Sequence, residues 1–335
     1  MIRIAVDGMG GDHAPEPIVK GTLMALEKFE NIEITIFGDE TRMAPYLKQH
    51  PRLQVVHTTS YLEMGEKDPI KQYRTNKEAS MFLAMQHVKE GKAEAVVSAG
   101  PTQALVVGGH FIIRRMAAMH RVAIAPVIPS FDGRGRILLD SGANVDFKPE
   151  HLLDFAIYAS IVAEKVLHYK APKVALINIG TEEGKGREFD KETYALLKAS
   201  KDIHFYGNIE PKEVLTSEAD VLLSDGFTAN IVMKTIEGTA KGIGAILKRE
   251  IKSSLSAMIG ALFMKRALKR FKQSLDPSEI GGALLMGFNG IVIKAQGATQ
   301  AYGFYNAIRQ AKEMVEVDVI RLVNETLDKK EAKKA

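Results

Sequence analysis

Short apolar runs alternate with amphipathic helical patterns along most of this chain. The runs are almost unbroken, as in residues 173–177, and such strands are typical of a sheet covered on both faces. The alternation therefore predicts an α/β fold with a mainly parallel sheet between helices. Predicted strands lie at 2–6, 32–37, 53–57, 93–98, 122–128, 136–140, 173–177, 202–206, 219–224 and 291–294. Predicted helices lie at 15–29, 41–49, 77–90, 103–119, 149–168, 187–199, 229–250, 253–272 and 299–326.

Two consecutive helical patterns, 229–250 and 253–272, interrupt this alternation. The sequence contains no internal repeat and no flexible linker. We therefore expect one α/β/α domain over residues 1–328, from which a helical segment at about 240–275 protrudes. The last residues, 329–335, form a charged tail that we expect to fray.

Composition narrows the class of protein. The 335 residues are 46% hydrophobic and include 28 glycines, which suits a globular α/β protein. There is no cysteine, so disulfides, a thiolate nucleophile, iron–sulfur clusters and cysteine-type zinc sites are excluded. Because Met1 leads directly into a predicted strand and no run of 18 apolar residues occurs, we expect neither a signal peptide nor a membrane-spanning helix. These features predict a cytoplasmic protein.

The charge is unevenly distributed along the chain. The net charge of the whole chain is +4. Residues 241–275 contain nine Lys and Arg and a single acid, Glu250, and therefore carry +8. The remainder carries −4, so a mildly acidic body bears a strongly basic segment.

The first predicted strand runs into a glycine-rich loop, residues 7–15, with the sequence DGMGGDHAP. Glycines allow the backbone to turn sharply and to approach a ligand closely. Pro15 and Pro17 are typical of a first helical turn. A strand, a glycine loop and a helix N-terminus together favour anion binding by backbone N–H groups, and the alternative is a tight structural turn. The spacing is not that of the dinucleotide-binding fingerprint.

Polar residues also follow later predicted strands, and ligands of parallel sheets bind at the carboxyl ends of strands. Ser98 and Thr102 follow one strand, and their hydroxyl groups suit either a phosphate or a helix cap. Asp140, Asn144 and Asp146 follow another strand and suit the orientation of a ligand or a metal. Because these acids are few and irregularly spaced, we do not expect a dedicated divalent-cation site.

Two further loops contain the sharpest candidates. Lys185 stands between two glycines after the strand at 173–177, so its ammonium can reach a ligand that the backbone also approaches. The alternative is a solvated surface lysine, and the P-loop pattern does not match. After the strand at 219–224, Thr228 or Asn230 begins a helix and suits either an oxyanion donor or a cap.

Residues 253–272 predict a basic amphipathic helix. Its uncharged part, 253–264, is too short to span a bilayer, so the pattern favours binding to a membrane surface. The alternatives are a helix packed in a core or dimer interface and a docking surface for an acidic protein. Nucleic acid is not expected, because few aromatic residues interleave the cations. The apolar stripe consists of Leu255, Met258, Ile259, Leu262 and Phe263, and Lys265 and Arg266 follow it.

Taken together, these loops resemble the bacterial phosphate acyltransferase family of phospholipid synthesis, over about residues 2–310. The resemblance implies a homodimer with a three-layer α/β/α fold related to phosphotransacetylases and isocitrate dehydrogenases. It implies transfer of a long-chain acyl group from acyl carrier protein to inorganic phosphate. It also implies peripheral membrane association and delivery of the acyl phosphate to a membrane glycerol-phosphate acyltransferase. The motifs that carry it are residues 7–15, 138–144, 178–186, 207–210, 225–230 and 281–283.

The chain departs from the family pattern at some positions but retains His13, Lys185 and Asn230. The departures favour one alternative, a catalytically impaired membrane-associated scaffold. A second alternative is a soluble phosphotransacetylase that uses acyl-CoA. A dehydrogenase of the same fold needs clustered aspartates and a nucleotide site, which the sequence lacks. The departures are Pro101 for Asn, Gln103 for Gly, Val122 for Pro, Ala229 for Gly and Gln296 for His.

The candidate residues favour direct attack of phosphate on a thioester. Phosphate is already anionic at neutral pH, so it needs capture and alignment more than a general base. We expect Lys185 and the N–H groups of residues 8–12 to hold phosphate, and Asn230 to stabilise the oxyanion. No covalent acyl-enzyme, metal or cofactor is required. The expected phosphate ligands are Gly10, Gly11, Asp12, His13, Ser98 and Thr102, and the expected supporting residues are Asp7, Asn144 and Asp225.

Overall fold

A computed structural model describes residues 1–65, 68–144, 146–274 and 281–332 of the protein. The strands of these residues form two sheets. The large sheet has the order β3–β2–β1–β4–β12–β11–β5, and the small sheet has the order β6–β7–β10–β8–β9. Neighbouring strands are parallel, except that β11 is antiparallel to β5 and β12, and β6 to β7. The large sheet contains β1 Ile2–Asp7, β2 Ile32–Gly38, β3 Leu53–His57, β4 Ala95–Ser98, β5 Ala123–Ala125, β11 Ala283–Met286 and β12 Ile291–Lys294. The small sheet contains β6 Val127–Ile128, β7 Arg136–Leu139, β8 Lys173–Ile177, β9 His204–Ile209 and β10 Val221–Leu223.

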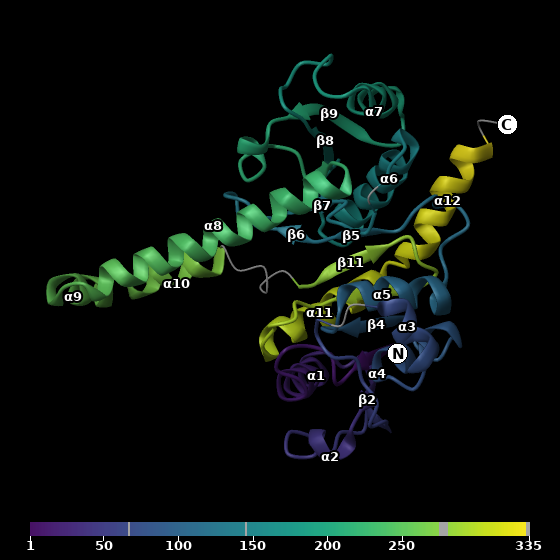
Figure 1. The fold of residues 1–335 in the computed structure, drawn as a ribbon, viewed down its shortest axis with the longest axis vertical. Helices are drawn as coiled ribbons and strands as arrows, with labels where there is room; N and C mark the ends of the chain where they lie inside the picture. Colours follow the sequence, from purple (N-terminus) through teal and green to yellow (C-terminus); the bar gives the residue numbers. More distant parts are fainter. Residues whose placement is uncertain (66–67, 145, 275–280, 333–335) are drawn as a thin grey trace.

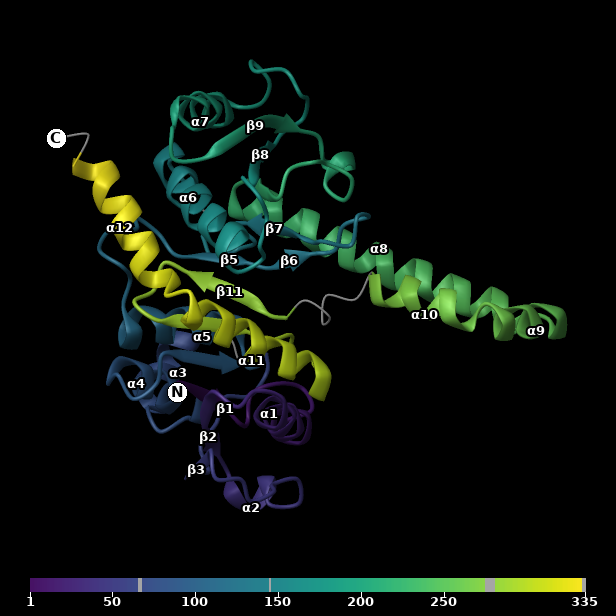
Figure 2. The same cartoon turned by 180° about the vertical axis from the view of Figure 1, so that it is seen from behind.

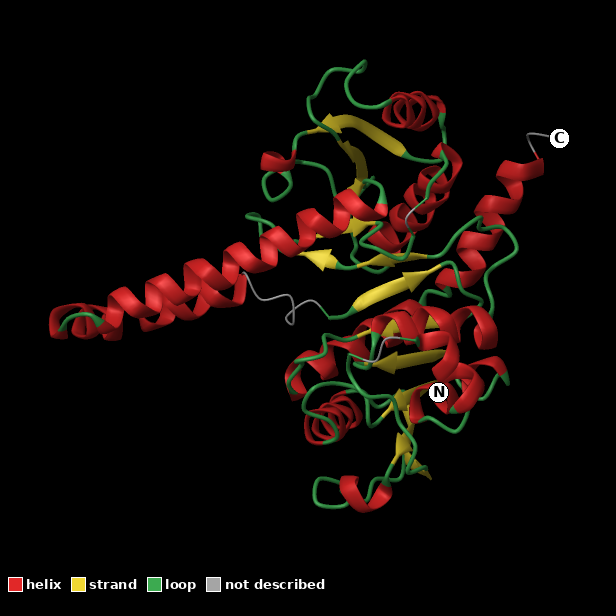
Figure 3. Cartoon of the chain, viewed as in Figure 1, coloured by secondary structure: helices red, strands yellow, loops and turns green. Residues whose placement is uncertain are grey.

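Helices cover the sheets, as Figures 1 and 3 show. The mainly parallel α/β fold is therefore confirmed. The body contains α1 Glu16–Lys28, α2 Glu40–Met43, α3 Pro69–Thr75, α4 Ser80–Lys89, α5 Thr102–Gly108, α6 Pro149–Lys165, α7 Glu188–Ala199, α11 Ala301–Glu316 and α12 Val319–Ala332.

Alternate residues of β1 enter two apolar cores, as the period of a strand requires. Ile4 and Val6 pack in the core that includes α1 and α11, whereas Ala5 packs in the core that includes α4 and α5. The first core also contains buried residues of β7, β8, β10 and α6, such as Leu139 and Phe155. One continuous core therefore joins the large sheet to the small sheet.

The predicted strand at 122–128 is wrong as a single element. Its first part is β5 of the large sheet and its last part is β6 of the small sheet. Pro126 lies between them, and proline has no N–H to donate to a strand ladder. The chain therefore changes sheets at this residue.

Several predicted helices are shorter than their patterns. The helix predicted at 103–119 consists of α5 and one π-helical turn, Gly109–Ile113. It stops there because Arg114 adopts a φ of 70°. The helix predicted at 299–326 is divided into α11 and α12, where Asp318 has a φ of 50°. The helix predicted at 41–49 shortens to α2, and neither α3 nor β11 was predicted. Residues 329–332, assigned to the charged tail, continue α12, and 333–335 lie outside the described residues.

Three helices project from the body and are called the projecting helices below. α8, Gly226–Lys252, extends away from the small sheet, and α9, Leu255–Phe263, lies at its tip. α10, Lys265–Ser274, returns beside α8, as Figures 1 and 2 show from opposite sides. The predicted single helix at 253–272 is therefore two helices, and residue 275 lies outside the described residues.

Candidate active site

The carboxyl ends of three neighbouring strands, β1, β4 and β12, bring their loops together. Asp7 ends β1 and is only 1% exposed, and its carboxylate accepts hydrogen bonds of 2.6 Å from the hydroxyls of Ser80 and Ser98. Burial raises the pKa of Asp7, and these two hydrogen bonds oppose the rise. Asp7 therefore holds the segments around Ser80 and Ser98 together at this edge of the sheet.

The glycine-rich loop packs closely against the loop after β4. A Cβ atom on Gly10 would overlap both the Asp7 carboxylate and the backbone of Gly100. Gly11 has a φ of 114°, which favours glycine, and the N–H of Asp12 donates to the carbonyl of Gly297 at 2.8 Å. Because Asp12 and its neighbour His13 are exposed, the outer part of this loop can meet a ligand.

Ser98 is fully buried, and its hydroxyl group donates a hydrogen bond to Asp7. Its Oγ also accepts from the N–H of Gly100 at 2.9 Å. This hydroxyl therefore supports Asp7 and the loop at Gly100, and its contact with phosphate stays a prediction. Thr102, by contrast, is partly exposed at the beginning of α5.

Lys294, which was not among the residues predicted from the sequence, lies in the same cluster. It ends β12, and its ammonium donates to the carbonyls of Ala99 at 3.0 Å and Ala295 at 2.5 Å. Burial lowers the pKa of Lys294 to about 8, although the charges of Asp12 and Asp7 oppose the change. The signal in the sequence was a single lysine at the end of an otherwise apolar strand, Ile291-Val292-Ile293.

A second set of loops follows the strands of the small sheet. Asp140, after β7, accepts hydrogen bonds from the N–H of Ile124 at 2.9 Å and from the Asn144 side chain at 2.9 Å. The Asn144 amide also donates to the carbonyl of Val122 at 2.6 Å. Burial raises the pKa of Asp140, and these bonds oppose the rise. Asp140 and Asn144 thus hold the loop, and no cluster of three metal-ligating side chains occurs among the described residues.

Asp225 begins α8. Its carboxylate accepts from the N–H groups of Phe227 at 3.1 Å and Thr228 at 2.9 Å, which caps the helix. Arg187 reaches it at 2.6 Å and also pairs with Asp190 at 2.9 Å. Burial raises the pKa of Asp225, but the hydrogen bonds from Arg187 and Thr228 outweigh it and lower the pKa overall. No motif in the sequence indicated this role of Arg187.

Lys185 and Asn230 lie near these caps. The Lys185 side chain is 49% exposed, and its Nζ lies 3.7 Å from a carboxylate oxygen of Glu182. Asn178 donates to the carbonyl of Lys185 at 3.1 Å and so fixes the loop from inside. Asn230 donates one amide hydrogen to the carbonyl of Ser141 at 3.0 Å and keeps a second.

The two sets of loops open in the same direction. In Figure 1 the arrowheads of β4 and β9 point to the side from which α8 projects. Within the described ranges, however, no hydrogen bond or ion pair links Lys185 or Asn230 to residues 7–13. The candidate residues thus fall into two sets on one side of the molecule, which we call the half-sites.

The projecting helices expose the residues of the predicted apolar stripe. Their exposed fractions range from 48% for Met258 to 88% for Phe263, and α9 has no buried residue. Lys265 and Arg266 are also exposed, but they begin a separate helix, α10. None of the helices in the described part of the chain is long and apolar enough to cross a membrane.

Comparisons with known proteins agree over nearly the whole chain. Residues 2–322 match the family described as "Fatty acid synthesis protein". A phosphate acyltransferase of Acholeplasma laidlawii is 58% identical over 329 residues, which cover 98% of each chain. One of Bacillus pumilus is 45% identical over 328 residues, which also cover 98% of each. A solved phosphotransacetylase from Streptococcus pyogenes is 16% identical, has a TM-score of 0.60, and shares the fold over 93% of this chain and 94% of its own.

Proposed function

This chain belongs to the fatty acid synthesis protein family and is an acyltransferase, and we propose that it transfers a long-chain acyl group from acyl carrier protein to inorganic phosphate. The observation that carries the proposal is the 58% identity to a phosphate acyltransferase over 98% of both chains. The strand-end loops on one side of the molecule give that relationship a chemical basis.

The proposed reaction is a direct substitution at the thioester carbonyl. An oxygen of hydrogen phosphate attacks the carbonyl carbon, and the C–S bond then breaks as the C–O bond is retained. The proton of hydrogen phosphate passes to the leaving sulfur, so the products are acyl phosphate and the free thiol of the carrier. Because phosphate is the nucleophile, the residues have to bind charge and align the reactants.

Each half-site supports one part of this reaction. The N–H group of Gly11, the exposed loop residues Asp12 and His13, and Thr102 form the proposed phosphate side. Gly10, the other glycine predicted to bind phosphate, is buried, and its N–H bonds the Asp7 carboxylate. We add Lys294 to it, since two of its three ammonium hydrogens are used and the third remains.

On the small sheet, the exposed Lys185 ammonium would bind the phosphate from the opposite half-site, and the remaining amide hydrogen of Asn230 suits a developing oxyanion. Asp225 and Asn144 hold the backbone around them. A substrate bound between the half-sites would connect residues that do not touch each other here.

The projecting helices support peripheral attachment to the inner face of the membrane. The apolar side chains of α9 are exposed, and cations follow at the beginning of α10. Apolar side chains enter the acyl region, while nearby cations attract anionic lipids. Attachment would bring the acyl phosphate to a membrane glycerol-phosphate acyltransferase, the enzyme proposed to consume it.

A homodimer is the proposed assembly. Phe227 is 69% exposed and Ile231 is 48% exposed in the first turns of α8, next to Asn230. Large apolar side chains exposed together are typical of a protein interface. A second copy packed on this part of α8 would cover them.

The decisive experiment is turnover of palmitoyl-acyl carrier protein with and without inorganic phosphate, followed by release of the free thiol. We expect release only with phosphate, and faster turnover with the carrier than with palmitoyl-CoA. A preference for short acyl-CoA would contradict the proposal in favour of a soluble phosphotransacetylase. No release from folded protein would favour the scaffold.

The same assay tests Lys185. We expect Lys185→Ala to lower kcat/KM by about 100-fold, because it removes a charge aimed at the reacting groups. Lys191→Ala is the matched control, since Lys191 is an exposed lysine on α7 that pairs with Glu188. Equal turnover of both variants would remove Lys185 from the catalytic site.

A further inference from the structure

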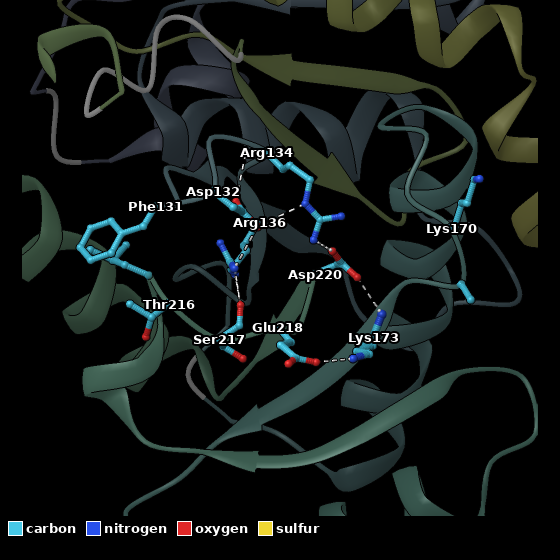
Figure 4. Close-up of a pocket in the computed structure, with 12 residues that line it drawn as sticks. Phe131, Asp132, Arg134, Arg136, Lys170, Lys173, Thr216, Ser217, Glu218 and Asp220 are labelled. Atoms are coloured by element: carbon cyan, nitrogen blue, oxygen red, sulfur yellow. Dashed lines mark hydrogen bonds and ion pairs between the residues drawn. The ribbon is translucent and has the colours of Figure 1, made fainter. Parts of the chain in front are cut away.

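A pocket lies at the opposite end of the small sheet from the candidate active site. It has a volume of about 640 Å³ and is formed where β7, β8 and β10 begin. Arg136 is the first residue of β7, Lys173 is the first of β8, and Asp220 precedes β10. Figure 4 shows these residues, with Phe131 at one side of the pocket and Lys170 at the other. We call it the Arg136 pocket.

Arg136 is a buried cation with an unused donor group. Arg136 as a whole is only 3% exposed. The Nε and Nη2 atoms both donate to the carbonyl of Ser217, and Nη2 lies 3.4 Å from Asp132. In the described part of the chain, its Nη1 atom has no hydrogen-bond partner. A buried donor without an acceptor is unfavourable, and the penalty is larger for a charged group.

The neighbouring acids do not neutralise the pocket. Asp132 accepts from Arg134 at 3.2 Å, and Asp220 accepts from the same guanidinium at 3.1 Å. Burial raises the pKa of Asp132, but hydrogen bonds from Ser130 and Arg134 lower it to about 2, so this acid is ionised at neutral pH. Even so, four cationic and three acidic side chains line the pocket, and its net charge is positive.

The pocket also has an apolar rim. Phe131 is 73% exposed, although its backbone N–H is fixed by the carbonyl of Leu215 at 3.1 Å. An aromatic side chain held in solvent beside a buried cation suits a ligand with both an apolar part and a charged group.

The loop on the other side of the pocket is strained. His168 and Ala171 have φ values of 59° and 47°, which non-glycine residues rarely adopt. They flank Tyr169 and Lys170, and Tyr169 stays in place because its hydroxyl donates to the carbonyl of Gly135 at 3.1 Å. Such strain concentrates at ligand-binding segments.

We propose that the Arg136 pocket binds a small organic anion, whose phosphate or carboxylate group accepts from Arg136 and whose apolar part covers Phe131. Nη1 is itself buried, so the Arg136 side chain has to turn toward the pocket for an acceptor to reach this atom, and that contact then removes the penalty of the unpaired donor. The surplus positive charge attracts the anion, and Arg134 adds a second, half-exposed guanidinium at the entrance. The site is independent of the acyl-transfer reaction, because it lies at the amino ends of the strands.

Calorimetric titration of the full chain with phenyl phosphate and with benzoate tests the proposal. We expect saturable binding of one equivalent of at least one probe, and the tighter probe identifies the charged group. Phenol, which has the ring without the anion, should bind at least tenfold more weakly. No saturable binding at millimolar concentrations of either anion, or equal binding of phenol, would overturn the proposal.

Variants place the binding in the pocket. Arg136→Gln should weaken binding at least tenfold, because a hydrogen bond to a charged donor is lost. Phe131→Ala changes only an exposed side chain, so it tests the pocket even if the buried substitution unfolds the protein. Two control variants should bind the probes like the unchanged protein. They are Lys77→Met, at an exposed lysine distant in sequence from the pocket residues, and Lys185→Ala. If the Phe131→Ala variant bound the probe as tightly as the unchanged protein, or if Lys185→Ala abolished binding, the ligand would lie elsewhere and the proposal would be wrong.

Discussion

Lys294, at the candidate active site, is a buried lysine, and burial disfavours its charged form. Its ammonium is held by two carbonyl groups while the surrounding protein lowers its pKa to about 8. An ordinary lysine titrates near 10.5. The charge of this side chain therefore changes just above neutral pH, in the range where an enzyme is easily assayed.

We expect the KM for phosphate to rise as the pH increases from 7 to 9. Lys294 loses its proton in this range, and a neutral amine no longer attracts phosphate. Well above the pKa, the rise should approach about tenfold per pH unit. The profile of kcat/KM against pH is the measurement, because it reports the free enzyme.

Two variants separate charge from structure at this position. Lys294→Arg should keep the cation and flatten the rise in KM, whereas Lys294→Met should give a high KM at every pH. Between about pH 8 and 10.5 the unfolded chain binds more protons at this residue than the folded chain. Stability of the unchanged protein should therefore rise with pH in that window, and Lys294→Met should remove this contribution. A Met variant with an unchanged KM profile would make Lys294 purely structural.

At the scale of elements, the projecting helices separate apolar surface from charge. α9 ends in Leu262 and Phe263, which are 71% and 88% exposed, and Met264 connects them to the basic α10. The apolar residues thus lie at the tip, and the cations begin where the chain turns back toward the body. This order suits a tip that enters a membrane surface while the returning helix contacts headgroups.

We expect Leu262→Asp combined with Phe263→Asp to weaken vesicle binding at least 100-fold. Each buried apolar side chain contributes about 1.5–3 kcal/mol, and the new charges are repelled by anionic lipid. Co-sedimentation with vesicles of phosphatidylglycerol and phosphatidylethanolamine measures the effect.

The control for this variant is Ser256→Asp, which adds one negative charge to α9 without removing an apolar side chain. It should retain most of the binding. Unchanged sedimentation of the double variant would show that α9 is not the membrane contact.

At the scale of the whole molecule, one core joins the two sheets. The loops of the candidate active site on both sheets face the same direction. The projecting helices leave the body on that side, as Figure 1 shows. A dimer through the first turns of α8 would therefore leave the tips of the projecting helices free, on the same side of the molecule as the half-sites.

We expect a solution mass of twice the chain mass of 36.8 kDa, measured by sedimentation equilibrium. Ile231→Asp should shift the protein toward the monomer, because a charge would be buried in the apolar contact. The double variant at Leu262 and Phe263 should remain dimeric, which separates assembly from membrane binding. A monomer at micromolar concentration would contradict the proposed assembly.

Local patterns predicted much of the fold and of the candidate site. The strands at 53–57, 173–177 and 291–294 have the predicted bounds, because their apolar runs end abruptly in polar residues or glycine. The candidate loop with Lys185 was predicted after 173–177 for the same reason, whereas Lys294 at the end of 291–294 was not. The sequence does not reveal that Asp7, distant along the chain, accepts the hydroxyl hydrogen of Ser98.

The sequence by itself determined the α/β class, the glycine loop, the candidate loops after strands and the basic apolar segment, because periodicity and composition act over a few neighbouring residues. Tertiary structure decided the division into two sheets, the burial of Lys294 and the unpaired donor of Arg136. These features depend on strand pairing and on neighbours that are distant along the chain. A side chain's pKa and hydrogen-bond partners are set by what surrounds it in space.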